Sequence, residues 1–374
     1  MNFEFSPEQV ELRGTARRFL AKHCPPAAVR AALEGAAPYD AALWAGLADM
    51  GFLRCAIPET YGGLGLGYLE LCVLAEEMGR VLAPVPLSSS LYLAAGLLLA
   101  AGSEAQKQHW LPRLATGEAI GTLALAEQPG AVTEGSIQAR LTGGTLTGAK
   151  WPVPDGTVAD FAILAARMPE GLTLALVGLK QPGVTCQPLD VLDPSRPHAR
   201  VTFADAPAEL LGRPGEGWAP LQRVLDEAAV LFAFEQLGGA ERALEMARDY
   251  ALERMAFGRP IGSFQAIKHK LADMYVSTTL ARSNAYYGAW ALASGTEELP
   301  LAAAVARISA TEAFQHCARE NHQIHGGMGF TWESDCHLFY RRANQLALGL
   351  GPIAAWEDRL VAQLQARRLP GAPK

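Results

Sequence analysis

The alternation of hydrophobic and polar positions divides this chain into three zones. Residues 1–118 and 218–374 repeat apolar side chains at helical spacing, whereas residues 119–217 contain short β-rich runs separated by turn residues. We therefore expect an α+β protein with an N-terminal helical domain, a middle antiparallel β-domain and a C-terminal helical bundle, each occupying one of these zones.

Local signals predict several helices in the first zone. Ser6 is followed by Pro7 and, at the capping-box position, by Gln9, which predicts a helix that begins directly after Ser6. The apolar stretch at residues 91–102 is shorter than the about 18 residues of a membrane span, so we expect a buried core helix there. The helical pattern around that stretch extends over residues 88–101, and further helices are predicted over residues 39–50, 68–80 and 104–116.

The middle and C-terminal zones differ in their hydrophobic period. The β-rich runs predict a compact antiparallel barrel or sandwich, with strands over residues 121–126, 136–141, 145–150, 161–166, 172–179, 184–187 and 199–203. In the last zone, residues 221–255 predict one long helix that is broken only at Gly238-Gly239.

Composition narrows the class of protein. Half of the 374 residues are hydrophobic, which excludes a disordered chain, and a net charge of −6 without a basic run argues against a nucleic-acid partner. The largest basic clusters are pairs such as Arg341-Arg342, which we interpret as a solvated helix face. The first residues lack the pattern of a secretory signal and the six cysteines form no C-x-x-C, so we expect reduced cysteines and a cytoplasmic location.

Motif searches favour neither a metal site nor a nicotinamide site. No P-loop, G-x-S-x-G or H-E-x-x-H sequence occurs. Residues 349–354 fit G-x-G-x-x-A but follow a helical pattern rather than a strand. His322 and His325 are three residues apart and have no nearby set of cysteines or carboxylates, so no metal site is predicted.

Two clusters carry candidate binding chemistry. In residues 254–265 a helix ends at a turn where we expect Arg254, Arg259 and Gln265 to converge with Phe257. A guanidinium suits a diphosphate, and an aromatic ring suits a planar base. In residues 323–330 three glycines in four positions allow the backbone to approach a ligand closely. The alternatives are an ordinary helix–turn–helix and a plain helix C-cap with its loop.

The two clusters resemble the flavin-binding signatures of the acyl-CoA dehydrogenase family. The first fits R-x-x-F-G-x-x-I-G-x-F-Q and the second fits Q-I-H-G-G-x-G-F, while a G-G-L-G loop at residues 62–65 and an E-E-M-G-R stretch at residues 76–80 match as well. The resemblance covers essentially the whole chain, and it implies a C-terminal four-helix bundle and FAD as the cofactor. The residues that it implies in contact with the FAD of a neighbouring subunit are Arg254, Phe257, Gln265, Gln323, Gly326 and Gly327.

The resemblance also implies a reaction and partners. The reaction is α,β-dehydrogenation of an acyl-CoA thioester in lipid metabolism, in which a carboxylate removes the α-proton and the β-hydrogen passes as hydride to flavin N5. The implied electron acceptor is an electron-transfer flavoprotein. The subunits are expected to pair, as a homodimer or a tetramer, so that each helps to bind the other's flavin.

The catalytic carboxylate departs from the family pattern. Leu350 and Ala228 occupy the two positions where family members carry the base, and neither side chain can take a proton. Glu235 ends an apolar run seven residues past Ala228, on the same helix face, and a raised pKa would suit it as a substitute base. The alternative is that Glu235 pairs with an Arg between helices. Glu227 points away from the face of Ala228 and is the weaker candidate.

The part of the site that meets the flavin ring is altered too. Ala126 replaces a hydroxyl of the family pattern, and Pro152 and Pro154 replace its flavin-facing Trp and Thr. Our expectation is an acyl-CoA dehydrogenase with Glu235 as its base. Two alternatives stay open, namely a non-catalytic or half-site subunit of a heteromeric acyl-CoA dehydrogenase, and a flavin oxidase or monooxygenase on the same fold.

Overall fold

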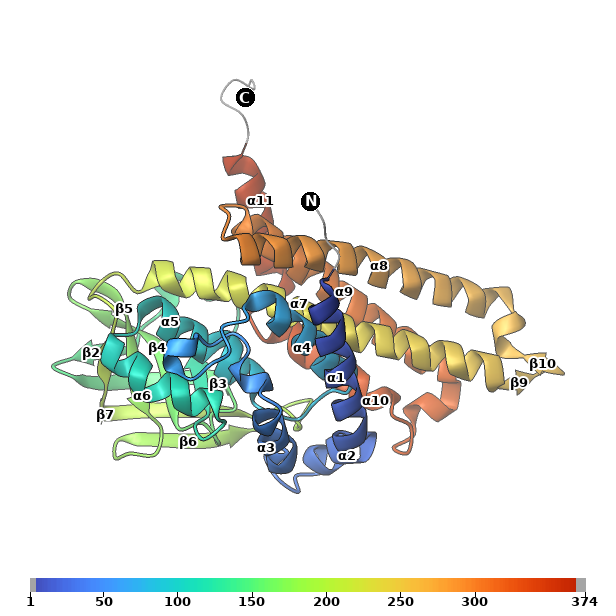
Figure 1. Ribbon diagram of the computed structural model, residues 1–374, viewed down its shortest axis with the longest axis horizontal. Coiled ribbons are helices and arrows are strands. Elements are labelled where there is room, and N and C mark those ends of the chain that lie inside the picture. The colour runs from blue at the N-terminus through green and yellow to red at the C-terminus, as the bar shows by residue number, and fades with distance from the viewer. Residues whose placement is uncertain (1–4, 368–374) are drawn as a thin grey trace. The chain divides into compact units, whose positions relative to one another are not determined.

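The computed structural model describes residues 5–367, and it confirms the order of helical, β and helical segments along the chain (Figure 1). Its α-helices are α1 (Pro7–His23), α2 (Pro26–Leu33), α3 (Ala41–Asp49), α4 (Tyr68–Arg80), α5 (Gly96–Ala101), α6 (Glu104–Ala115), α7 (Trp218–Glu253), α8 (Gln265–Ser294), α9 (Leu299–His325), α10 (Cys336–Leu348) and α11 (Ile353–Ala366). The strands of its main sheet are β1 (Gly121–Ala124), β2 (Arg140–Thr142), β3 (Thr145–Pro154), β4 (Phe161–Met168), β5 (Gly171–Gly178), β6 (Val184–Leu189), β7 (His198–Pro207) and β8 (Glu209–Leu211).

The chain packs as two compact units. Unit 1 consists of Met1–Pro26, Cys72–Ala83 and Ala229–Lys374, and unit 2 consists of Ala27–Leu71 and Pro84–Ala228. Unit 1 therefore contains the C-terminal helical bundle together with α1 and most of α4. Unit 2 contains the sheet and the remaining N-terminal helices. The division into domains at residues 1–118, 119–217 and 218–374 stays a prediction.

The first helix begins as its capping signal predicts. The Ser6 side chain accepts a hydrogen bond from the Gln9 backbone N–H (3.3 Å), and the Gln9 side-chain oxygen accepts one from the Ser6 N–H (2.9 Å). This reciprocal pair satisfies two backbone donors that a helix start otherwise leaves unpaired. The sequence identified this start because both partners lie within four residues of each other.

Helix α7 is continuous from Trp218 to Glu253, so the expected break at Gly238-Gly239 is wrong. A Cβ at Gly238 would lie 1.9 Å from a backbone oxygen of α4, and one at Gly239 would lie 2.4 Å from the Phe314 ring on α9. Gly79 of α4 meets the backbone of α7 in the same way, at 1.8 Å. A helical glycine costs about 1 kcal/mol relative to alanine, and here it allows two helices to pack directly against the backbone of α7.

The sheet of unit 2 has the strand order β6-β7-β3-β2-β4-β5-β8, with β1 beside β4. Most neighbouring strands are antiparallel, as expected, but β4 pairs in parallel with β1 and with β2. Strand β8 was not predicted, because its three residues are too short to show a period. The segment at residues 88–101 is the expected buried core helix, made of a π-helical turn, η3 (Ser88–Ala95), followed by α5.

Candidate functional site

The first predicted cluster forms a tight hairpin after α7. Strands β9 (Met255–Ala256) and β10 (Arg259–Pro260) pair in antiparallel fashion around Phe257 and Gly258, whose φ angles are +52° and +77° (Figure 1). Positive φ at both central positions is the geometry of a type I′ hairpin turn. Phe257 is 95% exposed despite its aromatic side chain, and the hairpin therefore presents a large apolar ring to whatever binds there.

The second predicted cluster closes the C-terminal end of α9. Gly326 has a φ of +61°, and the short helix η6 (Gly326–Phe330) folds back so that a Cβ at Gly329 would lie 2.7 Å from the His322 carbonyl oxygen. A Cβ at Gly326 or Gly327 would instead meet no described atom within 4 Å. The backbone at these two glycines thus faces open space, as a ligand-binding loop requires.

The structure brings the two clusters to the same end of the bundle in unit 1. The Tyr250 ring in the last turn of α7 stacks on the His325 ring at the end of α9, with centroids 4.1 Å apart. An ion pair between Lys270 of α8 and Glu320 of α9 makes a second link. The predicted ligands Arg254, Phe257, Gln265 and Gln323 all have exposed side chains.

The donor set of this region suits a dinucleotide. The exposed guanidinium of Arg254 has no ion-pair partner within residues 5–367, which leaves its planar donors available to a diphosphate. Phe257 supplies an exposed aromatic surface for a planar base, and Gly326 and Gly327 leave room for close backbone approach. The residues present therefore fit the adenosine and diphosphate end of FAD.

The positions of the usual family base hold no titratable side chain. Ala228 is fully buried in unit 2. Leu350 lies in the connection between α10 and α11, where its backbone carbonyl accepts a hydrogen bond from Trp356 Nε1 at 3.1 Å. Neither residue can remove a substrate proton. At these two positions the structure therefore has no substitute for the glutamate of the family.

Glu235 pairs with an arginine of another helix, which was the alternative to its role as a base. Its side chain is buried and lies 4.0 Å from a guanidinium nitrogen of Arg342, which is also buried and which donates to the Leu82 carbonyl oxygen at 3.1 Å. The interpretation of Arg341-Arg342 as a solvated face is therefore wrong for Arg342, because α10 packs it against α7 and residue 82. The sequence could not name this partner, because only the tertiary packing brings α10 to α7.

Glu227, the weaker candidate, is engaged within unit 2. Its carboxylate accepts hydrogen bonds from the Tyr68 hydroxyl at 2.9 Å and from Arg223 Nε at 3.0 Å. Tyr68 was not singled out from the sequence, and no motif there signals this contact. The arrangement ties the start of α7 to the start of α4, which is a structural role.

The altered positions of the β-domain offer no side-chain donor. The Trp151 N–H donates to the Ala126 carbonyl oxygen at 2.8 Å, and the Pro154 carbonyl accepts from the Thr122 hydroxyl at 2.6 Å. Next to them, buried Lys150 contacts Glu127 at 2.6 Å, and desolvation lowers the pKa of Lys150 to about 8 against the raising effect of that carboxylate. The backbone carbonyls at Ala126 and Pro154 are thus hydrogen-bonded, while the hydroxyl and the indole of the family pattern are missing at these positions.

No group of three metal-ligating side chains occurs within residues 5–367. Burial lowers the pKa of His322 and of His325, which favours the neutral imidazole at neutral pH. His325 Nδ1 lies 2.9 Å from the Asn321 carbonyl oxygen. Both histidines thus act as packed residues at the end of α9.

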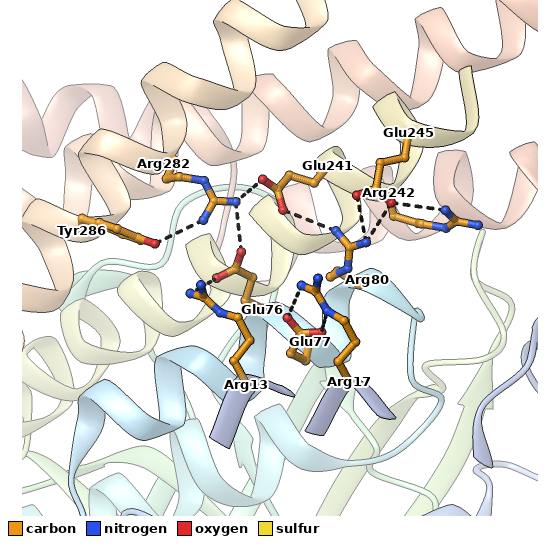
Figure 2. A network of polar contacts seen from close by, with 10 residues as sticks. All are labelled: Arg13, Arg17, Glu76, Glu77, Arg80, Glu241, Arg242, Glu245, Arg282 and Tyr286. Atoms are coloured by element: carbon orange, nitrogen blue, oxygen red, sulfur yellow. Dashed lines mark hydrogen bonds and ion pairs between the residues drawn. The ribbon is translucent and has the colours of Figure 1, made fainter. Parts of the chain in front are cut away.

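A network of ion pairs, which the sequence did not predict, joins four helices of unit 1 (Figure 2). Glu76 of α4 accepts from Arg13 of α1 at 3.3 Å and from Arg282 of α8 at 3.0 Å, and Arg80 of α4 contacts Glu245 of α7 at 2.8 Å. Although burial raises the pKa of Glu245, the hydrogen bonds and charges of Arg80 and Arg242 lower it overall. The full set drawn in Figure 2 is Arg13, Arg17, Glu76, Glu77, Arg80, Glu241, Arg242, Glu245, Arg282 and Tyr286. The network joins α7 to α8, and the hairpin lies in the chain between the end of α7 and the start of α8.

The fold defines a class of proteins in which a sheet lies between two helical segments of the chain. Residues 6–118 match the model of the acyl-CoA dehydrogenase N-terminal domain, and residues 215–363 match that of the acyl-CoA dehydrogenase C-terminal domain. The chain belongs to the acyl-CoA dehydrogenase family, whose members are FAD-dependent oxidoreductases. The bundle and sheet observed here are those of the family fold.

Three relatives illustrate the similarity. Acyl-CoA dehydrogenase IpdE2 of Mycobacterium tuberculosis is 36% identical over 341 residues, covering 90% of this chain and 91% of the relative. The solved structure of a variant of the Tcur3481-Tcur3483 steroid ACAD is 33% identical, with a TM-score of 0.87 and coverage of 96% and 99%. The ChsE4-ChsE5 complex from Mycobacterium tuberculosis is 30% identical, with a TM-score of 0.90 and coverage of 99% and 100%.

No helix within residues 5–367 is both long enough and apolar enough to cross a lipid bilayer.

Proposed function

We propose that this chain is one subunit of a heteromeric acyl-CoA dehydrogenase. In this proposal it completes the FAD site of a homologous subunit, and the homologous subunit supplies the catalytic base. The reaction is the α,β-dehydrogenation of an acyl-CoA thioester in lipid metabolism, and the electrons leave to an electron-transfer flavoprotein.

One contrast carries the proposal: the chain has the residues expected at the adenosine end of the flavin site, but it has no carboxylate at either position where family members carry the base. Ala228 and Leu350 cannot accept a proton, and the buried carboxylate of Glu235 faces Arg342. A base must approach the substrate α-carbon with an available lone pair. A carboxylate paired with a buried guanidinium is poorly suited to that task.

The roles of this chain's own residues follow from their chemistry. Arg254 would hold the diphosphate, Phe257 would pack on the adenosine, and Gln265 would donate or accept at the same end. Gln323 and the backbone at Gly326 and Gly327 would approach the same cofactor from the opposite side. FAD supplies the two-electron acceptor when it is bound. The losses at Ala126, Pro152 and Pro154 concern the ring end, which in this proposal belongs to the homologous subunit.

Two of the related solved structures support a mixed assembly, because the name of each gives two components: the ChsE4-ChsE5 complex and the Tcur3481-Tcur3483 steroid ACAD. The proposal extends that organisation to this chain. Another relative of known structure is described as an electron transferring flavoprotein of Acidaminococcus fermentans, at 27% identity and a TM-score of 0.91.

The test compares the chain alone with the chain co-expressed with a homologous acyl-CoA dehydrogenase subunit that carries the family's glutamate. We expect the chain alone to be nearly colourless and the mixed assembly to hold flavin that bleaches when an acyl-CoA from a broad panel is added. Full flavin occupancy with bleaching in the homomer would refute the proposal. In that case a homomeric dehydrogenase with Glu235 as its base is the second candidate.

A matched variant strengthens this test. Arg254→Ala in this chain should lower the flavin content of the mixed assembly, whereas the same substitution at exposed Arg213, outside the predicted site, should not. Rapid reoxidation of the reduced flavin by oxygen would instead point to an oxidase or monooxygenase.

A further inference from the structure

Each of the two turns predicted to bind the flavin, the 255–260 hairpin and η6, is fixed to its own helix. A Cβ at Gly262, just after the hairpin, would lie 2.9 Å from the Ala251 carbonyl oxygen of α7, and the Ile261 N–H donates to the Arg254 carbonyl oxygen at 2.8 Å. The η6 turn closes in the same manner on the last turn of α9, with Gly329 against the backbone of His322. Each turn therefore moves with its helix end, and the distance between the turns depends on what joins the two helices there.

The ring stack of Tyr250 and His325 connects the end of α7 to the end of α9. Tyr250 lies one helical turn before Arg254, and residues four apart share a helix face. His325 is the last residue of α9 and directly precedes Gly326. The two rings are 4.1 Å apart and inclined by 23°, which is a close stacked arrangement. The stack thus sits between the guanidinium expected on the diphosphate and the glycines expected on the other side of the cofactor.

The ion pair of Lys270 and Glu320 acts at a neighbouring point. Lys270 lies in the second turn of α8, five residues after Gln265, and Glu320 lies three residues before Gln323 on α9. Lys270 is the more exposed partner, with 37% of its side chain accessible against 13% for Glu320. A partly exposed ion pair is screened by water and salt and contributes little, whereas an aromatic pair contributes free energy beyond that of its buried area, and the inference is therefore built on the ring stack.

From this geometry we propose that Tyr250 and His325 are positioning residues, which set the spacing of the two turns for the adenosine and diphosphate end of the cofactor. The inference rests on the proposed function and deepens it, because neither residue is expected to touch the reacting atoms. Loss of the stack leaves each turn intact but lets the helix ends move apart. The consequence is weaker binding of the adenosine diphosphate part, while the surroundings of the flavin ring stay as they are.

The experiment uses the flavin-loaded assembly that the chain forms, whether with a second copy or with a homologous subunit. Tyr250→Leu removes the stack, and Tyr250→Phe keeps the ring and serves as the conservative variant. Phe19→Leu is the matched control, because it removes a stack of the same 23° inclination, that of Phe19 on His23 in α1. Flavin affinity is measured by titration of the apo-assembly with FAD, and ADP is then used as a competitor.

We expect Tyr250→Leu to raise the Kd for FAD and the inhibition constant for ADP by the same factor, about three- to tenfold, as the loss of one aromatic pair predicts. Tyr250→Phe and Phe19→Leu should stay within about twofold of the wild type. A Tyr250→Leu assembly with unchanged FAD affinity would overturn the inference, and so would a rise in Kd without a matching change for ADP. A wild-type chain that binds no flavin in any assembly would instead remove the proposed function, so the two failures are distinguishable.

Discussion

Replacing Glu235 by glutamine tests whether its carboxylate has a structural or a catalytic role. The substitution keeps the size and shape of the side chain but removes its charge. It leaves Arg342, which is 1% exposed, without the carboxylate 4.0 Å away. We expect the variant to lose stability and to keep its rate of flavin reduction in the mixed assembly.

The size of the stability loss follows from the burial of the pair. Two unit charges 4 Å apart interact by about 4 kcal/mol at an effective dielectric constant of 20, and removing one partner of a buried pair costs about 3–5 kcal/mol. Arg342 keeps its hydrogen bond to the Leu82 carbonyl, but desolvation lowers the pKa of buried Arg307 and the charge of Glu235 raises it, so we expect a loss within this range, at about 3–5 kcal/mol. Loss of a general base would instead reduce the rate about 10²–10⁴-fold.

Two measurements check this reasoning. Urea denaturation of the isolated chain should give the stability loss for Glu235→Gln and for Arg342→Met, while the double variant should lose less than the sum of the two single losses. Stopped-flow bleaching of the flavin in the mixed assembly should be unchanged by Glu235→Gln. A hundredfold slower reduction at normal stability would refute the ion-pair interpretation and identify Glu235 as the base.

Three further outcomes are expected. Gly238→Ala should destabilise the chain by more than about 2 kcal/mol, because the added Cβ would lie 1.9 Å from a backbone oxygen of α4, and urea denaturation measures this loss. Alkylation at about pH 8 should modify Cys186 before Cys55, since burial raises the pKa of the Cys55 thiol to about 12 and Cys186 is only half-buried; mass spectrometry of the native protein gives the order. Because the pKa of Glu245 is lowered from its ordinary value of 4.5, its contribution to stability is present above pH 4.5 and is lost as the pH falls through the lowered value. The difference in urea midpoint between the wild type and Glu245→Gln should therefore be large at pH 7 and shrink below pH 4.5, and a difference that grows with acid would contradict the sign.

The fold was predictable where the signal is local or repeated. The capping box of Ser6 and Gln9 and the apolar runs of β4 and β5 lie within short stretches, so the order of helices and strands could be predicted from the sequence. The continuity of α7 could not, because Gly238-Gly239 has the same local appearance in a broken helix and in a helix packed closely against others. Only the backbone of α4 and the ring of Phe314 distinguish the two cases.

In the candidate site, too, the residues of local motifs were predictable and the contacts between distant helices were not. Arg254 and the glycines of the 323–330 cluster were predicted because they lie in two compact motifs, and their role on FAD stays a prediction. The partner of Glu235 and the stack of Tyr250 on His325 could not be predicted. Both contacts depend on which faces of helices distant in sequence pack against each other, and the local pattern of one sequence does not determine that packing.

The interleaving of unit 1 has a consequence for the order in which the protein can be assembled. Arg13 of α1 and Glu76 of α4 lie 63 residues apart in the chain, whereas Arg282 of α8, which shares that carboxylate, follows Glu76 by 206 residues. The ion pairs of Glu76 are therefore complete only when the C-terminal helices have been synthesised and have packed against α4. An exchange of α1 between relatives would keep this arrangement only if the exchanged helix still matched the carboxylates of α4, one of which α8 shares through Arg282.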